Sequence, residues 1–398
     1  MFGMKPGLDS IGTVCSRLGD PQDALRVVHV AGTNGKGATC ALIESSLRAA
    51  GFSTGRYTSP HLVSLTERFM LNGAPVSEES LDEAYASLPD TEGLTYFELL
   101  TAAAFGLYRR KQVDWLVLET GLGGRLDATN IVKRPELCVI TRIGLDHCDW
   151  LGVTLREIAT EKGGIIKEGV PVVLGAMPDE ARDVLERIAK ERNAPCVYAP
   201  DAVKDTEIPS GFALGGKFNR ENALTSLAAL KVLGVGWGAI ERGFASVVWP
   251  GRFQKIVRDG RRFIVDGAHN PPAMRALVDS LKEDAMPVNA VICGFCGDKD
   301  VAANLALLRE VADRGLAVSI RNPRSLSAET TAKLMRESGF ADVRSCESLE
   351  EALSLAPDGT VVCGSLFLAG EVLQLLNAAP CGANVFTPNE TLSAAFHG

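Results

Sequence analysis

The chain has 398 residues, of which 46% are hydrophobic and 23% are charged, a composition typical of globular proteins. Its formal net charge is −8 and its isoelectric point is about 5.4, so a broad basic surface for nucleic acid is not expected. No stretch approaches the ~18 consecutive apolar residues of a membrane span. The N-terminal sequence MFGMKPGLDS lacks the apolar core of a secretory signal.

The first predicted unit is a strand, a glycine-rich turn and a helix within VVHVAGTNGKGATC. An apolar run at residues 27–30 ends in a turn around Lys36, and a helical pattern begins at Cys40. Backbone N–H groups of such a turn face the phosphates of a nucleoside triphosphate, and the lysine adds a positive charge. The standard P-loop would want Ser or Thr at position 37, where the chain has Gly37. A metal ion on the phosphates must therefore find its ligands elsewhere.

The rest of the first 250 residues alternates between strand and helix patterns, which predicts an α/β fold with mostly parallel sheets. In chain order, we expect a polar loop at 57–73, a helix at 95–110, a strand at 115–119, a glycine loop at 121–130, a strand at 137–143, a helix at 155–166, a strand at 170–174 and a helical stretch at 222–247.

A domain boundary is predicted at Trp249–Arg252. An Asp259-Gly260 turn follows and indicates a hairpin between strands 253–258 and 261–265. Strand–helix pairs then follow at 263–266 and 271–284, 288–295 and 301–314, 316–320 and 327–338, and 361–364 and 366–376. We expect an N-terminal P-loop domain at residues 1–250 and a smaller, doubly wound, Rossmann-like domain at 251–398, in which residues 379–398 form a loose tail.

The ten cysteines are irregularly spaced, and most lie inside apolar runs. This pattern favours reduced thiols in a cytoplasmic protein. Cys293 and Cys296 form one CxxC pair. A redox or zinc role would need a second pair or a suitable helix start, so packed thiols at the end of a strand are the favoured interpretation.

Three polar residues follow separate predicted strands and are candidate metal ligands: Ser59, Glu119 and His147. The carboxyl ends of parallel strands meet at one edge of a sheet, and oxygen and nitrogen ligands of this kind suit Mg²⁺ on nucleotide phosphates. The alternatives are a plain turn at Ser59, a solvated strand end at Glu119, and a purely structural, hydrogen-bonded side chain at His147. Lys162, between apolar neighbours of a predicted helix, reads from composition alone as a surface lysine.

The second domain begins with IVDGAHNPP at residues 264–272. Asp266 at the end of the strand is a candidate for binding a ribose hydroxyl, and His269 and Asn270 for binding a polar substrate. The alternative is a helix N-cap with its turn, since two prolines open the next helix. Arg252, between the domains, would either reach the phosphates or hold the linker in place.

Ten separated motifs follow one another along the chain, from about Phe2 to about Gly370: GMKPGLD, HVAGTNGKGA, YTSPHL, LTYFE, ETGLGGRLDATN, GLDH…LG, EKGGIIK, WPGRF, VDGAHNP and GSLFLAGE. Through them the chain resembles the folylpolyglutamate synthase/dihydrofolate synthase family of ATP-dependent Mur-type amide ligases. A chance match of ten motifs in order is negligible.

The resemblance implies a site for ATP, magnesium and two further substrates. It assigns the nucleotide to Gly32, Thr33, Asn34, Gly35, Lys36 and Gly37, completed by Asn222, Arg252 and Asp266. It assigns two magnesium ions to Ser59, Glu119 and His147, and a carbamate made from lysine and CO₂ to Lys162, which replaces the surface-lysine interpretation. The implied pteroate site comprises Thr95, Tyr96, Phe97, Glu98, Leu126, Asp127 and Ala128, and the implied glutamate site comprises His269 and Ser365. The implied catalytic residues are Lys36, Lys162 and His269.

The implied reaction joins L-glutamate to dihydropteroate or to the γ-carboxylate of a folate. A carboxylate oxygen first attacks the γ-phosphate of ATP, whose charge magnesium and Lys36 neutralise. The α-amino group of glutamate then captures the acyl phosphate and forms an amide. Whether His269 or Asp266 assists the deprotonation of that amine stays open. We expect a cytoplasmic monomer that acts on small molecules and binds neither nucleic acid nor membranes.

The chain departs from the family pattern at three places. The family usually has Ser or Thr at Ala38, and Ala at Gly163. Relatives also carry an additional helix before GMKPGL, so either the true start lies upstream or part of the lid over the pteroate site is missing.

Two other classes of protein would also use a P-loop of this kind. A cell-wall Mur ligase needs a UDP-recognition domain before the P-loop, and the 31 residues before Gly32 are too few for one. A P-loop ATPase or nucleotide-dependent regulator would need no acceptor. The pteroate-lining segments and the metal ligands argue against it, and negligible ADP release without glutamate would separate the two.

Overall fold

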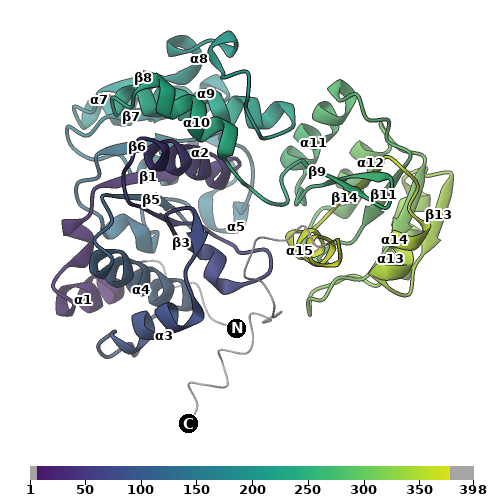
Figure 1. Ribbon diagram of the computed structural model, residues 1–398, viewed down its shortest axis with the longest axis horizontal. Coiled ribbons are helices and arrows are strands. Elements are labelled where there is room, and N and C mark those ends of the chain that lie inside the picture. Colours follow the sequence, from purple (N-terminus) through teal and green to yellow (C-terminus); the bar gives the residue numbers. More distant parts are fainter. Residues whose placement is uncertain (1–6, 377–398) are drawn as a thin grey trace. The chain divides into compact units, whose positions relative to one another are not determined.

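The computed structural model describes residues 7–376, which form two units, each built around its own β-sheet (Figure 1). Of the described residues, the N-terminal unit contains 7–61, 65–213 and 220–248, and the C-terminal unit contains 62–64, 214–219 and 249–376. The predicted tail at 379–398 and the first part of the GMKPGLD motif lie outside the described residues.

The sheet of the N-terminal unit has eight strands in the order β4-β3-β2-β5-β1-β6-β7-β8. The six strands from β2 to β8 in this order run parallel, whereas β3 and β4 are antiparallel to their neighbours. The strands are β1 Val27–Ala31, β2 Thr54–Tyr57, β3 Phe69–Leu71, β4 Ala74–Pro75, β5 Trp115–Glu119, β6 Leu137–Ile140, β7 Val172–Leu174 and β8 Cys196–Tyr198. The chain moves to one side of β1 for β2 and β5 and to the other for β6, so β1 lies at a switch point where such sheets bind ligands.

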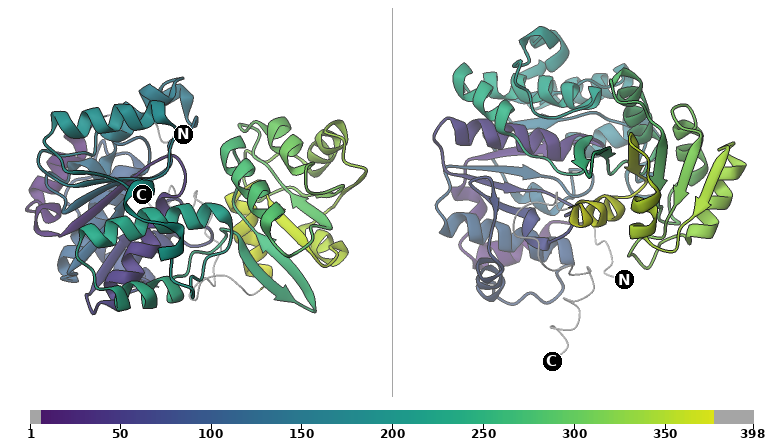
Figure 2. Two further views of the ribbon diagram at one scale, coloured as in Figure 1. Left: turned by 90° about the horizontal axis from the view of Figure 1, so that it is seen from above. Right: turned by 45° about the vertical axis from the view of Figure 1, so that its right-hand side comes forward.

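Helices cover both faces of this sheet (Figures 1 and 2). One face packs on a core that includes Val27, Leu116 and Leu118 with residues of α1 and α4, and α2 packs against α10. The α-helices are α1 Asp9–Arg17, α2 Lys36–Ala49, α3 Glu78–Ala86, α4 Tyr96–Arg110, α5 Cys148–Leu151, α6 Leu155–Gly163, α7 Asp179–Glu191, α8 Ala199–Ala202, α9 Lys217–Val232 and α10 Trp237–Ser246. The start of α9, up to residue 219, belongs to the C-terminal unit. Four 3₁₀ turns are η1 Pro21–Ala24, η2 Leu65–Arg68, η3 Ala128–Ile131 and η4 Asp205–Glu207.

The C-terminal unit has a six-stranded sheet in the order β13-β12-β11-β14-β10-β9, parallel except for β9. Successive residues of β11 point to opposite faces. Val291 and Cys293 therefore pack with α11, α12 and α13, whereas Ile292 packs with α14 and α15. The elements are β9 Gln254–Arg258, β10 Arg261–Val265, α11 Pro271–Glu283, β11 Ala290–Cys293, α12 Val301–Leu308, β12 Arg314–Ala317, α13 Ala328–Glu337, β13 Asp342–Ser345, α14 Leu349–Leu355, β14 Thr360–Cys363 and α15 Leu366–Leu375. The predicted fold class, two α/β units with mostly parallel sheets, is confirmed.

Several predicted boundaries were wrong. The helical stretch 222–247 is two helices, α9 and α10, because the chain turns at Gly234 with a φ of +73°. The helix predicted to end at residue 166 ends at Gly163, and the pattern from Cys40 begins one turn earlier, at Lys36. Strand β13 was not predicted from the sequence, because none of its residues is fully buried and it lacks an apolar run.

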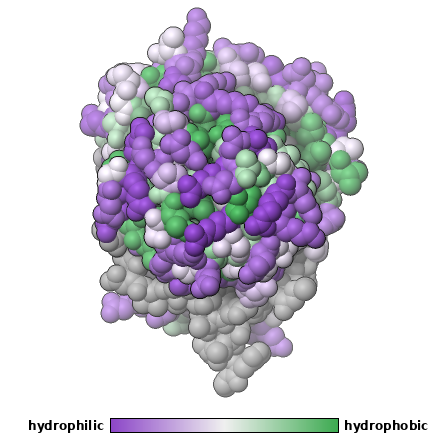
Figure 3. All heavy atoms as spheres, turned by 90° about the vertical axis from the view of Figure 1, so that its right-hand side faces the viewer, coloured by the Kyte–Doolittle hydropathy of each residue, from purple (hydrophilic) through white to green (hydrophobic). Residues whose placement is uncertain are grey.

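The surface in Figure 3 is mostly hydrophilic, and its apolar residues form small, separate patches. Between residues 7 and 376, no helix combines the length and the apolar character that crossing a bilayer demands.

Candidate active site

The glycine turn after β1 is closely packed and needs its glycines. Gly32 and Gly35 have φ values of +148° and +87°, in the region that favours glycine. A Cβ at Gly32 would overlap the Thr141 hydroxyl, and one at Gly35 would overlap the Asn222 side chain. Asn222 of α9 therefore lies against the turn. Because α2 starts at Lys36, the N–H groups of its first turn are available to an anionic ligand.

Hydrogen bonds fix this turn to the segment after β6. The Thr33 amide donates to the Arg142 carbonyl at 2.9 Å, and its hydroxyl donates to the Gly144 carbonyl at 3.0 Å. The Thr141 hydroxyl donates to the Asn34 carbonyl at 2.8 Å. The turn is thus held in one conformation by the protein itself.

Lys36, Glu119 and Ser59 come together beside this turn. The Lys36 Nζ donates to the carbonyls of Gly32 and Thr33, each at 3.2 Å, and lies 4.0 Å from Glu119 Oε1. Glu119 Oε2 accepts a hydrogen bond from the Ser59 amide at 3.1 Å. Glu119 is only 4% exposed, so its interpretation as a solvated strand end was wrong. The site therefore holds a buried carboxylate next to a lysine ammonium.

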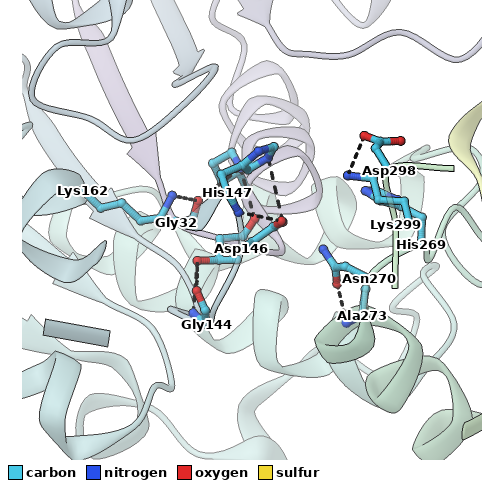
Figure 4. A network of polar contacts seen from close by, with 12 residues as sticks. Gly32, Gly144, Asp146, His147, Lys162, His269, Asn270, Ala273, Asp298 and Lys299 are labelled. Atoms are coloured by element: carbon cyan, nitrogen blue, oxygen red, sulfur yellow. Dashed lines mark hydrogen bonds and ion pairs between the residues drawn. The ribbon is translucent and has the colours of Figure 1, made fainter. Parts of the chain in front are cut away.

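His147 stands at the start of α5 with a φ of +51°, which non-glycine residues seldom adopt. Its side chain is half-exposed, and its Nε2 lies 4.0 Å from Asp146 Oδ2 (Figure 4). Its amide donates to Asp146 Oδ1 at 2.9 Å. Sequence reasoning missed Asp146, although an acid beside a candidate metal ligand is a usable signal. Such carboxylates orient histidine ligands.

The side chains beside this turn suit magnesium better than a metal ion whose ligands all come from the protein. In the part of the chain that the structure describes, no three His, Cys, Asp or Glu side chains cluster as a metal site. Magnesium is commonly held by one or two carboxylates together with the phosphates of its nucleotide. A buried Glu119 carboxylate next to the phosphate-binding turn fits that mode of binding.

Lys162 is buried, 4% exposed, in the last turn of α6. Its Nζ donates to the Gly32 carbonyl at 2.8 Å (Figure 4), so Lys162 and Lys36 share one acceptor. Burial, reinforced by the charge of Lys36, lowers the pKa of Lys162 from 10.5 to about 7. The surface-lysine interpretation was therefore wrong, and a large fraction of this amine is neutral near pH 7.

The glycine loop at 121–130 is docked on the same turn of α6. The Arg125 amide donates to the Glu161 carbonyl at 2.8 Å. A Cβ at Gly124 would lie 2.7 Å from the Lys162 carbonyl oxygen, so only glycine allows this approach. The position of the loop and the position of Lys162 are therefore linked through backbone contact.

The Asp127 carboxylate accepts hydrogen bonds from other residues of this loop. Its Oδ1 accepts from the Thr129 amide at 3.0 Å and from the Thr129 hydroxyl at 2.5 Å, and its Oδ2 accepts from the Leu122 amide at 2.7 Å. Burial raises the pKa of Asp127, while these hydrogen bonds lower it. Leu126 is 37% exposed and Ala128 is buried at the start of η3. Leu126 is therefore the member of the predicted Leu126–Ala128 segment with an accessible side chain.

The predicted substrate residues 95–98 lie next to that loop. Thr95 and Glu98 form a capping box at the start of α4, with the Thr95 amide donating to Glu98 Oε2 at 2.8 Å. Their polar groups thus stabilise the helix start. Tyr96 and Phe97 are partly buried, and a Cβ at Gly121 would lie 2.5 Å from Phe97 Cζ. The structure therefore brings the segments 95–98 and 121–130 together.

In the C-terminal unit, Asp266 closes the end of β10. Its Oδ2 accepts from the Phe253 amide and its Oδ1 from the Ala268 amide, both at 2.8 Å. Burial raises the pKa of Asp266, and the charge of Arg252 opposes this. The Arg252 guanidinium also donates to the Gly251 carbonyl at 2.9 Å. Arg252 and Asp266 are thus neighbours within this unit.

His269, Asn270 and Ser365 lie at two helix starts of the same unit. His269 Nδ1 lies 2.8 Å from the Gly267 carbonyl, which can only accept, so Nδ1 carries a proton. The Asn270 side chain accepts from the Ala273 amide at 2.9 Å (Figure 4), so the N-cap interpretation of Asn270 is confirmed. Ser365 caps α15 by accepting from the Phe367 amide at 3.1 Å.

The nine cysteines among the described residues are free thiols. Cys293 and Cys296 are buried, in agreement with the packed-thiol interpretation. The thiol of Cys293 lies beside that of Cys363 on the neighbouring strand, with 4.0 Å between the sulfur atoms.

Comparison with known proteins matches the Mur ligase middle domain at residues 30–202 and the Mur ligase glutamate ligase domain at residues 251–366. The dihydrofolate synthase/folylpolyglutamate synthase of Escherichia coli K12 is 38% identical over 397 residues, covering 94% of this chain and 92% of that protein. The structure of E. coli FolC in complex with DHPP and ADP is similar with a TM-score of 0.84 and 35% identity, covering 94% of each chain. A bifunctional folylpolyglutamate synthase/dihydrofolate synthase with Mn, AMPPNP and L-glutamate bound has a TM-score of 0.81 and 33% identity, covering 94% of this chain and 95% of that one. The chain therefore belongs to the folylpolyglutamate synthase/dihydrofolate synthase family of Mur ligases.

Proposed function

We propose that this protein is an ATP-dependent ligase that joins L-glutamate to dihydropteroate, to the γ-carboxylate of a folate, or to both. The observation that carries the proposal is family membership along almost the whole chain, with a relative of the same fold that binds Mn, AMPPNP and L-glutamate. The rigid phosphate-binding turn with Lys36, Glu119 and Ser59 beside it supports the same reaction.

In this proposal, ATP binds on the turn from Gly32 to Gly37, with Asn222, Arg252 and Asp266 as further nucleotide residues. Ser59, Glu119 and His147 hold the magnesium ions, which supply positive charge at the phosphates when bound. Lys36 adds a second positive charge on a helix N-terminus, so this chain alone already favours a triphosphate there. The Lys36 Nζ lies 4.0 Å from the buried Glu119 carboxylate, which orients the lysine side chain beside the turn.

Lys162 is proposed to carry a carbamate. A neutral amine attacks CO₂ and loses a proton, which gives a carbamate anion. The pKa of about 7 provides that neutral amine at neutral pH. Once formed, the anion would lie among the positive charges of Lys36 and the metal ions, which stabilise it.

The acceptor carboxylate attacks the γ-phosphate, forms an acyl phosphate and releases ADP. The glutamate amine then attacks the acyl carbon, phosphate leaves, and the amine loses its proton. Asp266 is a poor candidate to receive that proton because both of its oxygens already accept backbone N–H groups. In a neutral His269 ring whose Nδ1 donates to the Gly267 carbonyl, Nε2 is the atom that can take up a proton, so we assign the proton to His269.

The acceptor is proposed to bind over Tyr96, Phe97 and Leu126, the partly exposed apolar side chains of the two segments that meet beside Gly121. Residues 1–250 would hold the acceptor and, together with Arg252 and Asp266, ATP. Residues 251–398 would bind glutamate through His269 and Ser365. The free thiols of the described residues support a cytoplasmic location. We propose a monomer, which light scattering of the purified protein tests.

A single assay tests the function. Purified protein is given ATP, Mg²⁺ and glutamate, with dihydropteroate or tetrahydrofolate offered in parallel, and ADP and the amide product are measured. We expect ADP and amide in equal amounts, only when acceptor and glutamate are both present. Steady ADP release without glutamate would instead favour the ATPase alternative.

A further inference from the structure

A histidine that the proposed reaction does not use lies in the middle of β1. His29 is fully buried, and its Nε2 is 2.8 Å from the Thr129 hydroxyl in η3. Its other ring nitrogen, Nδ1, is also buried and has no hydrogen-bond partner in the described part of the chain. Burial, with a smaller effect of Lys167, lowers the pKa of His29 to about 3, so the ring is neutral. A buried polar ring with one bonded nitrogen needs an explanation beyond packing.

The contacts allow one arrangement of protons. The Asp127 carboxylate accepts two backbone N–H groups, from Thr129 and Leu122, so it is an acceptor. The Thr129 hydroxyl has one proton and donates it to Asp127 Oδ1 at 2.5 Å. That hydroxyl can then only accept from the ring, so His29 Nε2 carries the ring proton and Nδ1 is bare. His29, Thr129 and Asp127 therefore form one directed chain of hydrogen bonds.

These hydrogen bonds connect the central strand β1 to the loop at 121–130. Asp127 ties the Leu122 amide to Thr129, so its orientation sets the shape of the turn that carries Leu126. The same loop reaches Phe97 through Gly121 and the Lys162 turn through Gly124. A change in the Asp127 carboxylate would therefore move the surface proposed to bind the acceptor.

We propose that His29 is a positioning residue for the acceptor: through the Thr129 hydroxyl it holds Asp127, and with it the loop at 121–130, in the shape that binds the pterin-bearing substrate. The inference rests on the proposed function, since it deepens the role of the same loop. His29 itself touches no substrate, because it is fully enclosed in the sheet.

Variants of Thr129 test this chain of hydrogen bonds with little change in side-chain volume. Thr129→Val removes the hydroxyl and Thr129→Ser keeps it. The control is Thr331→Val in α13, which deletes another fully buried hydroxyl, one without a hydrogen-bond partner in the described residues. We expect Thr129→Val to raise the KM for the acceptor about tenfold, the scale of losing a hydrogen bond to a charged group. The KM values for ATP and glutamate should change less than twofold, and Thr129→Ser should restore the acceptor KM.

A direct readout does not depend on activity. Nitrogen-15 NMR of imidazole-labelled wild-type protein reports which ring nitrogen of His29 carries the proton, with His29→Gln used to assign its signals. We expect a proton on Nε2 and a bare Nδ1. If His29→Gln does not fold, the same signals are assigned from their shift in Thr129→Val.

The outcomes separate the two claims. A wild-type protein that makes no amide with any pterin-bearing acceptor contradicts the proposed function, and the positioning role fails with it. An active wild type contradicts the inference alone if Thr129→Val behaves like Thr331→Val. The same holds if all three KM values rise together, or if the proton resides on Nδ1.

Discussion

Replacing Lys162 by methionine should make the protein more stable at neutral pH, although it should remove activity. Methionine keeps a long unbranched stem but has no ionisable group. A pKa lowered from 10.5 to about 7 corresponds to about 5 kcal/mol that favours the neutral amine over the charged one in the folded protein. When the wild-type protein unfolds at neutral pH, this lysine takes up a proton, which favours the unfolded state. The free energy of unfolding of wild type is therefore lower than that of the variant by nearly this amount. The lost hydrogen bond to Gly32 subtracts only about 1 kcal/mol, because Lys36 still donates to that carbonyl.

The difference in stability between wild type and Lys162→Met should depend on pH. Between about pH 7 and 10.5 the unfolded chain binds more protons at this lysine than the folded protein does, so wild-type stability rises with pH in that window. Urea unfolding of wild type and Lys162→Met in CO₂-free buffers at about pH 6.5 and 9.5 measures the difference. We expect the variant to be more stable by several kcal/mol at the lower pH, with a much smaller gap at the higher one. An equal gap at both pH values, or a more stable wild type at the lower one, would refute the burial argument.

Three further substitutions test the rest of the site. Lys36→Ala should abolish ADP release while leaving the circular dichroism spectrum unchanged, and normal turnover would contradict its role at the phosphates. Glu119→Gln should raise the Mg²⁺ concentration for half-maximal activity by roughly tenfold, because one charged ligand becomes neutral; an unchanged titration curve would remove Glu119 from the metal site. Gly124→Ala should lower kcat at least tenfold, because its Cβ would meet the Lys162 backbone at 2.7 Å. Gly163→Ala is the matched control, since its Cβ would meet only the mobile ends of side chains, and an equal loss in both would argue against a specific effect at Gly124.

Local patterns predicted the elements whose signals lie within a few residues. The strand at 115–119 and the helix at 95–110 were predicted from the sequence, and they agree with β5 Trp115–Glu119 and, within one residue, with α4 Tyr96–Arg110. The doubly wound C-terminal unit followed from its repeated strand–helix pattern. β13 was missed because an edge strand with partly exposed residues lacks an apolar run.

Burial from distant contacts was not readable from the sequence. Lys162 looks like a surface lysine until the glycine loop docks on its helix turn, a contact that depends on Gly124. Segments 62–64 and 214–219 belong to the C-terminal unit, where Gly215 packs on Phe253 and Leu62 on Gly370. Neither segment carries a local signal for that packing.

The unusual glycine at position 163 also has a structural reason. A methyl group there would lie 2.7 Å from Ile188 Cδ1 and 3.0 Å from Leu185 Cδ2 of α7. An alanine there would therefore require the ends of these two side chains to shift. The resemblance alone showed the departure, and only the packing of α6 on α7 explains it.

Activation of a carboxylate by phosphorylation transfers one oxygen atom of the acceptor to the released phosphate. Dihydropteroate and a folate with oxygen-18 in the reacting carboxylate are each incubated with the protein, ATP, Mg²⁺ and glutamate, and the released phosphate is analysed by mass spectrometry. We expect one oxygen-18 atom in the phosphate for each amide formed. Phosphate without the label, from both acceptors, would contradict it.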